Sequence, residues 1–311
     1  MASGQPPGEG ADPDARGRPL SPRALRGRGA RPGGLLVVPL GLIVLAACGP
    51  VRVPEPSLVR VAGSDTMLPL ARRWADAFVE RNPGAVVQVE GGGTAAGVAR
   101  LIEGRADLAT GSRPLFYDEV RLMHDRHASL GVSFRCVRDA LCVYVHPDNP
   151  VRDIGLLQLK GLFAGRIGSW HKVGGREEPV RVLTRPPTSG SHRLFRELVL
   201  DEEPYSDRAT VLPTTGAIVE AVRADPTAVG YGGLAWGPDL VRLAIEGAAP
   251  TPQALRDGSY PLSRYLYLHS VRPPRGWAKS FVDFAFTAEG QRIAAEVGFV
   301  GLWETAPSPA R

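Results

Sequence analysis

Three short polar segments combine glycine with hydroxyl residues, and each lies between a run with a strand pattern and a run with helical spacing. They are residues 63–66 (GSDT), 91–94 (GGGT) and 185–191 (RPPTSGS). The first amide groups of a helix have no intrahelical acceptor, and the amino terminus of a helix carries a partial positive charge. Several such termini aimed at one point bind an anion. The pattern therefore predicts an anion-binding site built from three turns.

Side chains of these turns add further donors. Arg185 precedes Ser189 by four residues, and a planar guanidinium matches two oxygens of a tetrahedral anion. The hydroxyls that can donate to the other oxygens belong to Ser64, Thr66, Thr94, Ser189 and Ser191. Each turn taken singly is also explained by helix capping, which favours Ser, Thr and Asp without any ligand. Three such turns in one chain, one of them with an arginine, favour the anion site.

Strand and helix patterns alternate around the turns. Residues 58–63, 85–90 and 106–110 have the pattern of strands, and residues 66–82 and 91–104 have that of helices. Such alternation is typical of a largely parallel sheet covered by helices. Further on, helical spacing extends over residues 156–165, 192–200, 216–225 and 277–298, and strand patterns occur at 140–145, 179–184, 228–233 and 264–269.

The chain resembles the phosphate-binding proteins of bacterial phosphate ABC transporters from about Val59 to Leu302. The segments that carry the resemblance include GSDTMLPLARRWADAF, VEGGGTAAGVARLIEGRADLATGSRPL, TRPPTSGSHRLFRELVL and TGAIVEAVRADPTAVGYGGLAW. The resemblance implies a phosphate site formed by hydroxyls of the first two turns and by the Arg-x-x-x-Ser-Gly-Ser motif of the third. Its residues would be Ser64, Thr66, Gly93, Thr94, Ser112, Arg185, Ser189, Gly190 and Ser191.

Two departures from the family pattern affect ligand choice. Members of the family place an aspartate after the serine equivalent to Ser112, where it accepts the proton of phosphate, whereas this chain has Arg113. Asp65 is our substitute for that acceptor, although it is equally explained as a helix cap. Arg113 either adds an ionic contact to the ligand or binds a neighbouring carboxylate. Pro186 and Pro187 stiffen the third turn and remove two backbone donors.

The resemblance implies a two-lobed α/β fold of the type II periplasmic-binding-protein class. Each lobe would be a mainly parallel sheet flanked by helices, with two crossover strands as the hinge. We expect lobe one to comprise residues 58–138 plus 236–305 and lobe two to comprise residues 139–235, followed by a tail at 306–311. The expected crossings are DALCVYVHP and AVGYGGLAW. Ligand would lie in the cleft between the lobes.

The same resemblance implies a monomer that is not an enzyme, needs no cofactor, and passes inorganic phosphate to ABC permease subunits. A sensor or scavenger role and a different oxyanion (sulfate, molybdate or tungstate) remain as alternatives. A hydrolase is the alternative from another class. His124 and His127 lack a third metal ligand with suitable spacing, and His192 follows the third turn without a nucleophile motif.

The amino-terminal region has the layout of a bacterial secretory signal, with arginines between positions 16 and 31 before the apolar run at 35–47. Leu45-Ala46-Ala47-Cys48 resembles a lipobox, at which bacteria acylate the cysteine and cleave before it. We therefore expect residues 1–47 to be a signal peptide with an extension, Cys48 to carry lipid, and residues 48–57 to be a tether. This places the protein in the cell envelope, anchored to the membrane.

Export would expose cysteines to an oxidising compartment. Cys136 and Cys142 are symmetric about Asp139, so a tight turn at Asp139 would place them opposite each other on adjacent strands. A disulfide between them is one expectation, and two reduced core residues is the other. Without residues 1–47 the chain holds 31 basic and 29 acidic residues. This charge balance gives no reason to expect nucleic acid as a partner.

Overall fold

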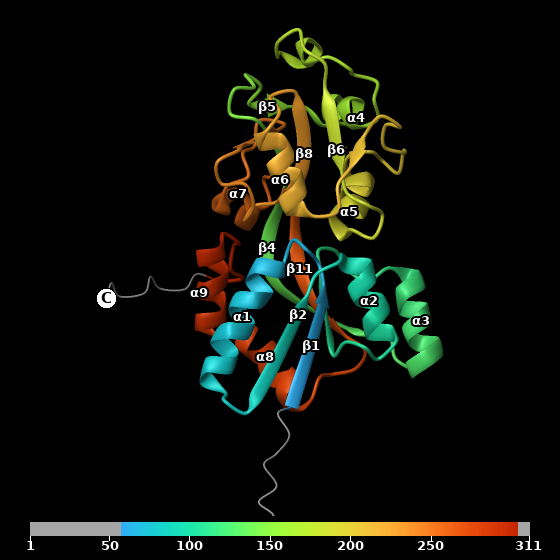
Figure 1. Cartoon of the computed structure of the whole chain (residues 1–311), viewed down its shortest axis with the longest axis vertical. Coiled ribbons are helices and arrows are strands. Elements are labelled where there is room, and N and C mark those ends of the chain that lie inside the picture. Colours follow the sequence, from blue (N-terminus) through green and yellow to red (C-terminus); the bar gives the residue numbers. More distant parts are fainter. Residues whose placement is uncertain (1–56, 304–311) are drawn as a thin grey trace, which may run out of the picture. The chain divides into compact units, whose positions relative to one another are not determined.

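Figure 1 shows the computed structural model of the chain, which describes residues 57–303. The expected signal peptide, the acylated Cys48 and the tail at 306–311 lie outside the described residues, as does the tether except for Ser57. Within residues 57–303, none of the helices is long and apolar enough to cross a membrane.

The first strands and helices follow the predicted order. β1 (Ser57–Gly63) pairs in parallel with β2 (Ala85–Glu90) and with β3 (Leu108–Gly111), and α1 (Leu68–Arg81) and α2 (Thr94–Ile102) connect them. β11 (Ser263–Ser270) then pairs with β3 in the antiparallel direction. Strand, helix, strand, helix, strand is therefore confirmed for this part of the chain.

A long strand, β4 (Val132–Val145), joins this part to the next. Its residues 132–140 pair with β11, and its residues 141–145 pair with β8 (Ala228–Gly233), both antiparallel. β8 continues in parallel to β6 (Arg181–Thr184), which pairs with β7 (Thr210–Val211). The strand order is β2-β1-β3-β11-β4-β8-β6-β7, with β9 (Val241–Arg242) beside β4. The expectation of two mainly parallel sheets is therefore wrong in detail, because antiparallel β4 and β11 make one continuous mixed sheet.

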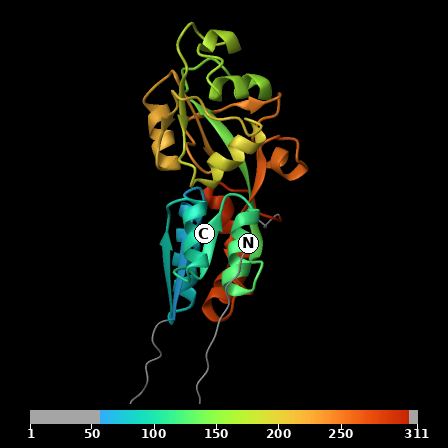
Figure 2. The ribbon, with the colours of Figure 1, turned by 90° about the vertical axis from the view of Figure 1, so that its right-hand side faces the viewer.

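Helices cover this sheet on both faces. Figures 1 and 2 show α1, α8 (Gly276–Ala285) and α9 (Ala288–Val297) on one side of β1–β3, and α2 with α3 (Tyr117–His127) on the other. The remaining described elements are α4 (Leu156–Phe163), the 3-10 helix η1 (Trp170–Val173), α5 (Gly190–Leu198), α6 (Thr215–Arg223), α7 (Pro252–Asp257), and the short pair β5 (Asp153–Ile154) with β10 (Ala244–Ile245).

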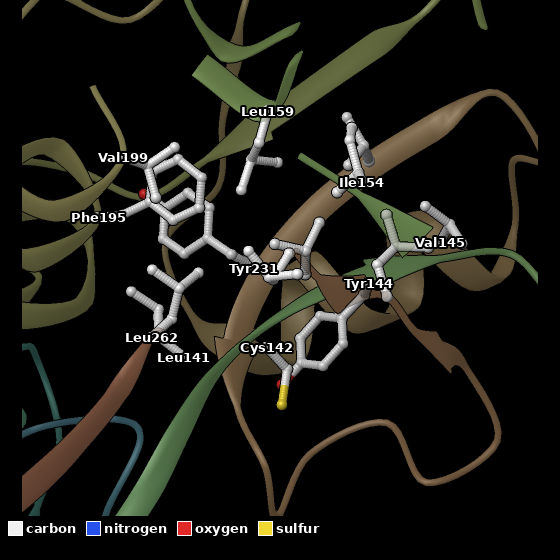
Figure 3. Close-up of a cluster of buried hydrophobic side chains, with 14 of the residues drawn as sticks. Leu141, Cys142, Tyr144, Val145, Ile154, Leu159, Phe195, Val199, Tyr231 and Leu262 are labelled. Carbon is white, nitrogen blue, oxygen red and sulfur yellow. The ribbon is translucent and has the colours of Figure 1, made fainter. Parts of the chain in front are cut away.

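The hydrophobic core has two large parts. The first cluster includes Trp74, Phe78, Leu108, Leu266 and Phe281, from α1, β3, β11 and α8. The second cluster gathers around Tyr144, Leu159, Phe195, Tyr231 and Leu262 (Figure 3). A small third cluster of Val98, Leu101, Ile102, Ala109 and Met123 lies between α2, β3 and α3.

Residues 240–262 differ from the expected division. We expected them in lobe one, but Leu240, Leu243, Leu255, Tyr260 and Leu262 pack in the second cluster. The chain returns to the first cluster only with β11, where Leu266 and Leu268 are buried. The reason is that β8, which was expected to cross, pairs only with strands around the second cluster, whereas β11 runs beside the first half of β4.

The disulfide expectation is wrong for the same strand. No turn forms at Asp139, and β4 runs through it without interruption. At about 3.3 Å per residue, Cys136 and Cys142 lie about 20 Å apart along the strand, far beyond the reach of a disulfide. Both are free and fully buried, Cys136 in the first cluster and Cys142 in the second (Figure 3).

Candidate anion-binding site

The three predicted turns meet. Thr66 Oγ1 of the first turn lies 3.2 Å from Ser191 Oγ of the third, and Ala95 N, one residue past the second turn, donates to Thr188 O at 3.1 Å. Side chains from all three are buried, with at most 7% of each residue exposed: Ser64, Asp65, Thr66, Thr94, Arg185, Ser189 and Ser191. Sequence segments more than 100 residues apart thus share one polar cluster, as predicted.

Ser112 joins the cluster from the end of β3. Its hydroxyl lies 3.2 Å from Thr94 Oγ1, and its amide donates to the same oxygen at 3.1 Å. The start of α5 packs directly against this pair. A Cβ placed on Gly190 would lie 2.4 Å from both Ser112 Oγ and Thr94 Oγ1, so only glycine fits there. This close approach places the start of α5 directly against the start of α2.

Asp65 and Arg185 link all three turns. Arg185 Nη2 donates to Asp65 Oδ2 at 2.6 Å, and the other carboxylate oxygen, Oδ1, accepts from Gly92 N at 3.0 Å. Arg185 Nη1 donates to Thr215 Oγ1 at 2.8 Å. The side chains of the ion pair are 2% and 9% exposed, so little water screens it. Nη2 also donates to Pro213 O at 3.0 Å, so protein acceptors hold the guanidinium in one orientation.

The alternative explanation by helix capping applies to some turns only. Ser189 caps α5, because its hydroxyl accepts from His192 N at 3.4 Å. α1 begins at Leu68 without a side-chain cap, and Asp65 instead bonds Gly92 and Arg185. The capping interpretation of Asp65 is therefore wrong.

Arg113 faces a carboxylate rather than the turns. Its Nη1 and Nη2 donate to the two carboxylate oxygens of Glu119 at 2.8 and 2.7 Å, and its guanidinium carbon lies 3.7 Å from the centre of the Phe116 ring. Of the two roles considered for Arg113, the structure has the one that binds a neighbouring carboxylate. We therefore correct its placement among the ligand-binding residues.

Two buried charged residues of the cluster were not predicted. Arg264 Nη1 donates to Ser191 Oγ at 2.8 Å, and Arg264 Nε donates to Asp139 Oδ2 at 2.8 Å. Burial raises the pKa of Asp139, and the nearby Arg264 opposes that shift. The available signal was a single carboxylate inside the apolar run 136–145 and a single arginine before the alternating run 265–268. We interpreted Asp139 as a turn residue, so its pairing with Arg264 was not predicted.

The three histidines considered for chemistry each have separate contacts in the fold. Burial lowers the pKa of His192 to about 4, so its ring is neutral near pH 7, and it stacks on Tyr205 with ring centres 4.4 Å apart. His127 Nε2 is bonded to Ile102 O, whereas His124 lies beside Asp125. In the described part of the chain, no group of three or more His, Cys, Asp or Glu residues is arranged to hold a metal ion.

A mixed β-sheet covered by helices, with buried polar turns that converge, is the arrangement of a solute-binding protein. The model of the PBP superfamily domain matches residues 50–289, and the chain belongs to this family.

Named relatives agree with this assignment. The phosphate-binding protein PstS of Bacillus subtilis is 27% identical over 243 residues, which cover 77% of this chain and 79% of the relative. A phosphate-bound crystal structure of a phosphate ABC transporter substrate-binding protein from Clostridium perfringens is 25% identical, with a TM-score of 0.74, and the match covers 79% of this chain and all of that one. An ABC-type phosphate transport receptor from Vibrio cholerae, also 25% identical, has a TM-score of 0.65 over 78% of this chain and 99% of that one.

Proposed function

We propose that this chain is an extracytoplasmic solute-binding protein that captures inorganic phosphate and delivers it to an ABC importer. The observation that carries the proposal is the buried Asp65–Arg185 pair set among the hydroxyls of three converging turns. The names of the Bacillus and Clostridium relatives, a phosphate-binding protein and a phosphate-transporter subunit, support the choice of ligand. Both are named as binding proteins rather than enzymes.

The chemistry of the cluster suits a tetrahedral oxyanion. Arg185 offers a charged donor, Thr66 and Ser191 offer hydroxyls, and the amino termini of α2 and α5 offer amides. Asp65 offers an acceptor for a ligand proton. Phosphate carries a proton near neutral pH and sulfate does not, so an acceptor facing the ligand favours phosphate.

We further propose two lobes built on the two large hydrophobic clusters, with residues 58–139 and 263–303 in one and residues 140–262 in the other. β4 and β11 would form the hinge, because β4 contributes to both clusters and β11 returns the chain to the first. The first two turns then belong to one lobe and the third turn to the other. Closure would press Arg185 and Ser191 onto an anion held by Ser64, Thr66 and Thr94.

We also propose that lipid on Cys48 attaches the protein to the membrane. A monomer tethered by residues 48–57 would reach permease subunits in the same membrane. The lipobox-like LAAC motif after the apolar run is the support for this anchor.

Titration calorimetry of the purified chain with phosphate tests the ligand, and competition with sulfate, molybdate and tungstate tests its identity. Binding of phosphate in preference to the other three is the expected result. Preference for another of these oxyanions would keep the site and change the ligand, and binding of none would refute the function.

A further inference from the structure

The hinge region carries a second buried ion pair. Asp139 on β4 and Arg264 on β11 are cross-strand partners, and their side chains are 0% and 3% exposed. Arg264 Nε and Nη2 lie 2.8 and 2.6 Å from Asp139 Oδ2, and Asp139 Oδ1 accepts from Leu234 N at 2.8 Å. Both carboxylate oxygens of Asp139 are therefore bonded, and they hold the guanidinium of Arg264 in one orientation.

The remaining nitrogen of Arg264 points into the hydroxyl cluster. Nη1 donates to Ser191 Oγ at 2.8 Å, and this oxygen lies 3.2 Å from Thr66 Oγ1. Gly233 lies in the narrow space between the ion pair and Thr66. A Cβ on Gly233 would lie 2.7 Å from Thr66 Cγ2 and 3.0 Å from Asp139 Oδ2. Arg264 is thus adjacent to hydroxyls from the first and third turns.

Stability alone does not account for a buried pair in this place. Replacing a buried ion pair by apolar residues of similar volume is often neutral or stabilising, because desolvation of both charges offsets their attraction. Ser191 also needs no more than a neutral donor for its hydroxyl oxygen. The positive charge of Arg264 beside the Ser191 hydroxyl is better explained by an anion that binds next to both groups.

Arg264 repeats the construction of Arg185. Each arginine is held by a buried aspartate, Asp139 or Asp65, and each reaches the cluster of turns. Arg113 is also buried, but Glu119 and the Phe116 ring occupy its guanidinium. The two buried arginines at the turns are therefore those that pair with a buried aspartate.

We propose that Arg264 is a second cationic ligand of the anion, which it contacts together with Ser191 and Thr66 while Asp139 holds its guanidinium. This inference rests on the proposed function and adds a residue that neither the turns nor their motifs include.

The test uses three variants of the purified chain: Arg264→Gln, the double variant Asp139→Asn with Arg264→Gln, and Arg138→Gln as control. Arg264→Gln alone leaves a buried carboxylate unpaired and can fail to fold. The double variant removes both charges and keeps two amides that can bond each other and Ser191. Arg138 neighbours Asp139 on β4, but it rests over the Tyr265 ring and donates to Leu255 O.

Thermal unfolding and calorimetric titration with inorganic phosphate are measured for each variant. We expect the double variant to unfold near the wild-type temperature yet bind phosphate about tenfold or more weakly, since a charged hydrogen bond is lost. The Arg138→Gln control should bind like wild type. Wild-type affinity in a folded double variant would overturn the inference and leave the proposed function intact. Absence of phosphate binding by the wild type would overturn both.

Discussion

Asp65 and Arg185 lie 120 positions apart in the sequence, and a 2.6 Å hydrogen bond joins them in a site from which almost all water is excluded. The pair connects the first turn to the third, and Gly92 N adds the second turn through the other carboxylate oxygen. One ion pair thus fixes the geometry of all three turns, so removal of either partner should affect ligand binding and not only stability.

Arg185→Ala should weaken phosphate binding at least tenfold, because loss of a charge-assisted hydrogen bond in a buried site costs roughly 1.5–3 kcal/mol. Calorimetry on the purified protein measures this effect. Arg181→Ala is the matched control, since Arg181 lies on the same strand β6 but pairs with Asp225 at the surface. Equal phosphate affinity in Arg185→Ala and wild type would exclude the third turn from the site.

Asp65→Asn should narrow the preference for phosphate over sulfate. A carboxylate repels an unprotonated sulfate oxygen, whereas an amide can donate to it. The affinities of both anions for both proteins at neutral pH give the ratio. Asp225→Asn, which alters a surface pair with Arg181, serves as the control. An unchanged ratio in Asp65→Asn would remove Asp65 from ligand selection.

The sequence predicted the turns well because each is a local feature. Glycine, hydroxyl residues and the start of a helix lie within a few positions of one another, so 63–66, 91–94 and 185–191 could be identified from type and spacing. Their convergence followed from the order of strands and helices. The role of Arg113 could not be chosen from the sequence. Its partner Glu119 faces it only because α3 begins at Tyr117.

Long-range strand pairing was the part that sequence could not provide. Asp139 between two apolar stretches suggested a turn, but its charge is balanced by Arg264 from a strand more than 100 residues later, so the strand continues. Because β11 pairs with the first part of β4, the chain returns to the first hydrophobic cluster at β11 and not at β8. Helical spacing over 277–298 likewise concealed a break, because Thr287 caps a new helix by accepting from Gly290 N.

Cys136 and Cys142 should remain reduced thiols in the folded protein. Burial raises the pKa of Cys136 to about 12 and also raises that of Cys142, so neither is a thiolate at neutral pH. A thiol reagent should label neither in the native Cys48→Ser variant and both after denaturation in urea without reductant. One or no labelled thiol in the denatured protein would contradict the prediction that both cysteines are free.

Cys48→Ser should abolish lipid attachment, because acylation requires the cysteine thiol. Metabolic labelling of the producing bacteria with a palmitate analogue, followed by fractionation, measures both lipid and membrane association. Cys142→Ser provides a control that leaves the motif intact. Equal labelling of wild type and Cys48→Ser would refute the lipobox interpretation.

The stability of the folded protein should fall as the pH is lowered from about 6.5 towards 4. Burial lowers the pKa of His192 and of His269 to about 4, well below the ordinary value of about 6.5 for histidine. Between these pH values the unfolded chain binds protons that the folded chain does not, and linkage then makes the free energy of unfolding decrease with decreasing pH. Below about 4 both states are protonated at these sites, so their contribution levels off.

Urea unfolding at a series of pH values measures this dependence, and the variant His269→Asn should reduce its slope. His269 is 0% exposed, and its Nδ1 lies 2.8 Å from Ser133 Oγ, so asparagine keeps a polar partner for the serine. His124→Asn, at an exposed position on α3, is the control. Carboxylates with lowered pKa, such as Asp225, lose their contribution at still lower pH, nearer their own ordinary range. If His269→Asn and wild type show the same slope between pH 6.5 and 4, the buried histidine ring does not control acid stability.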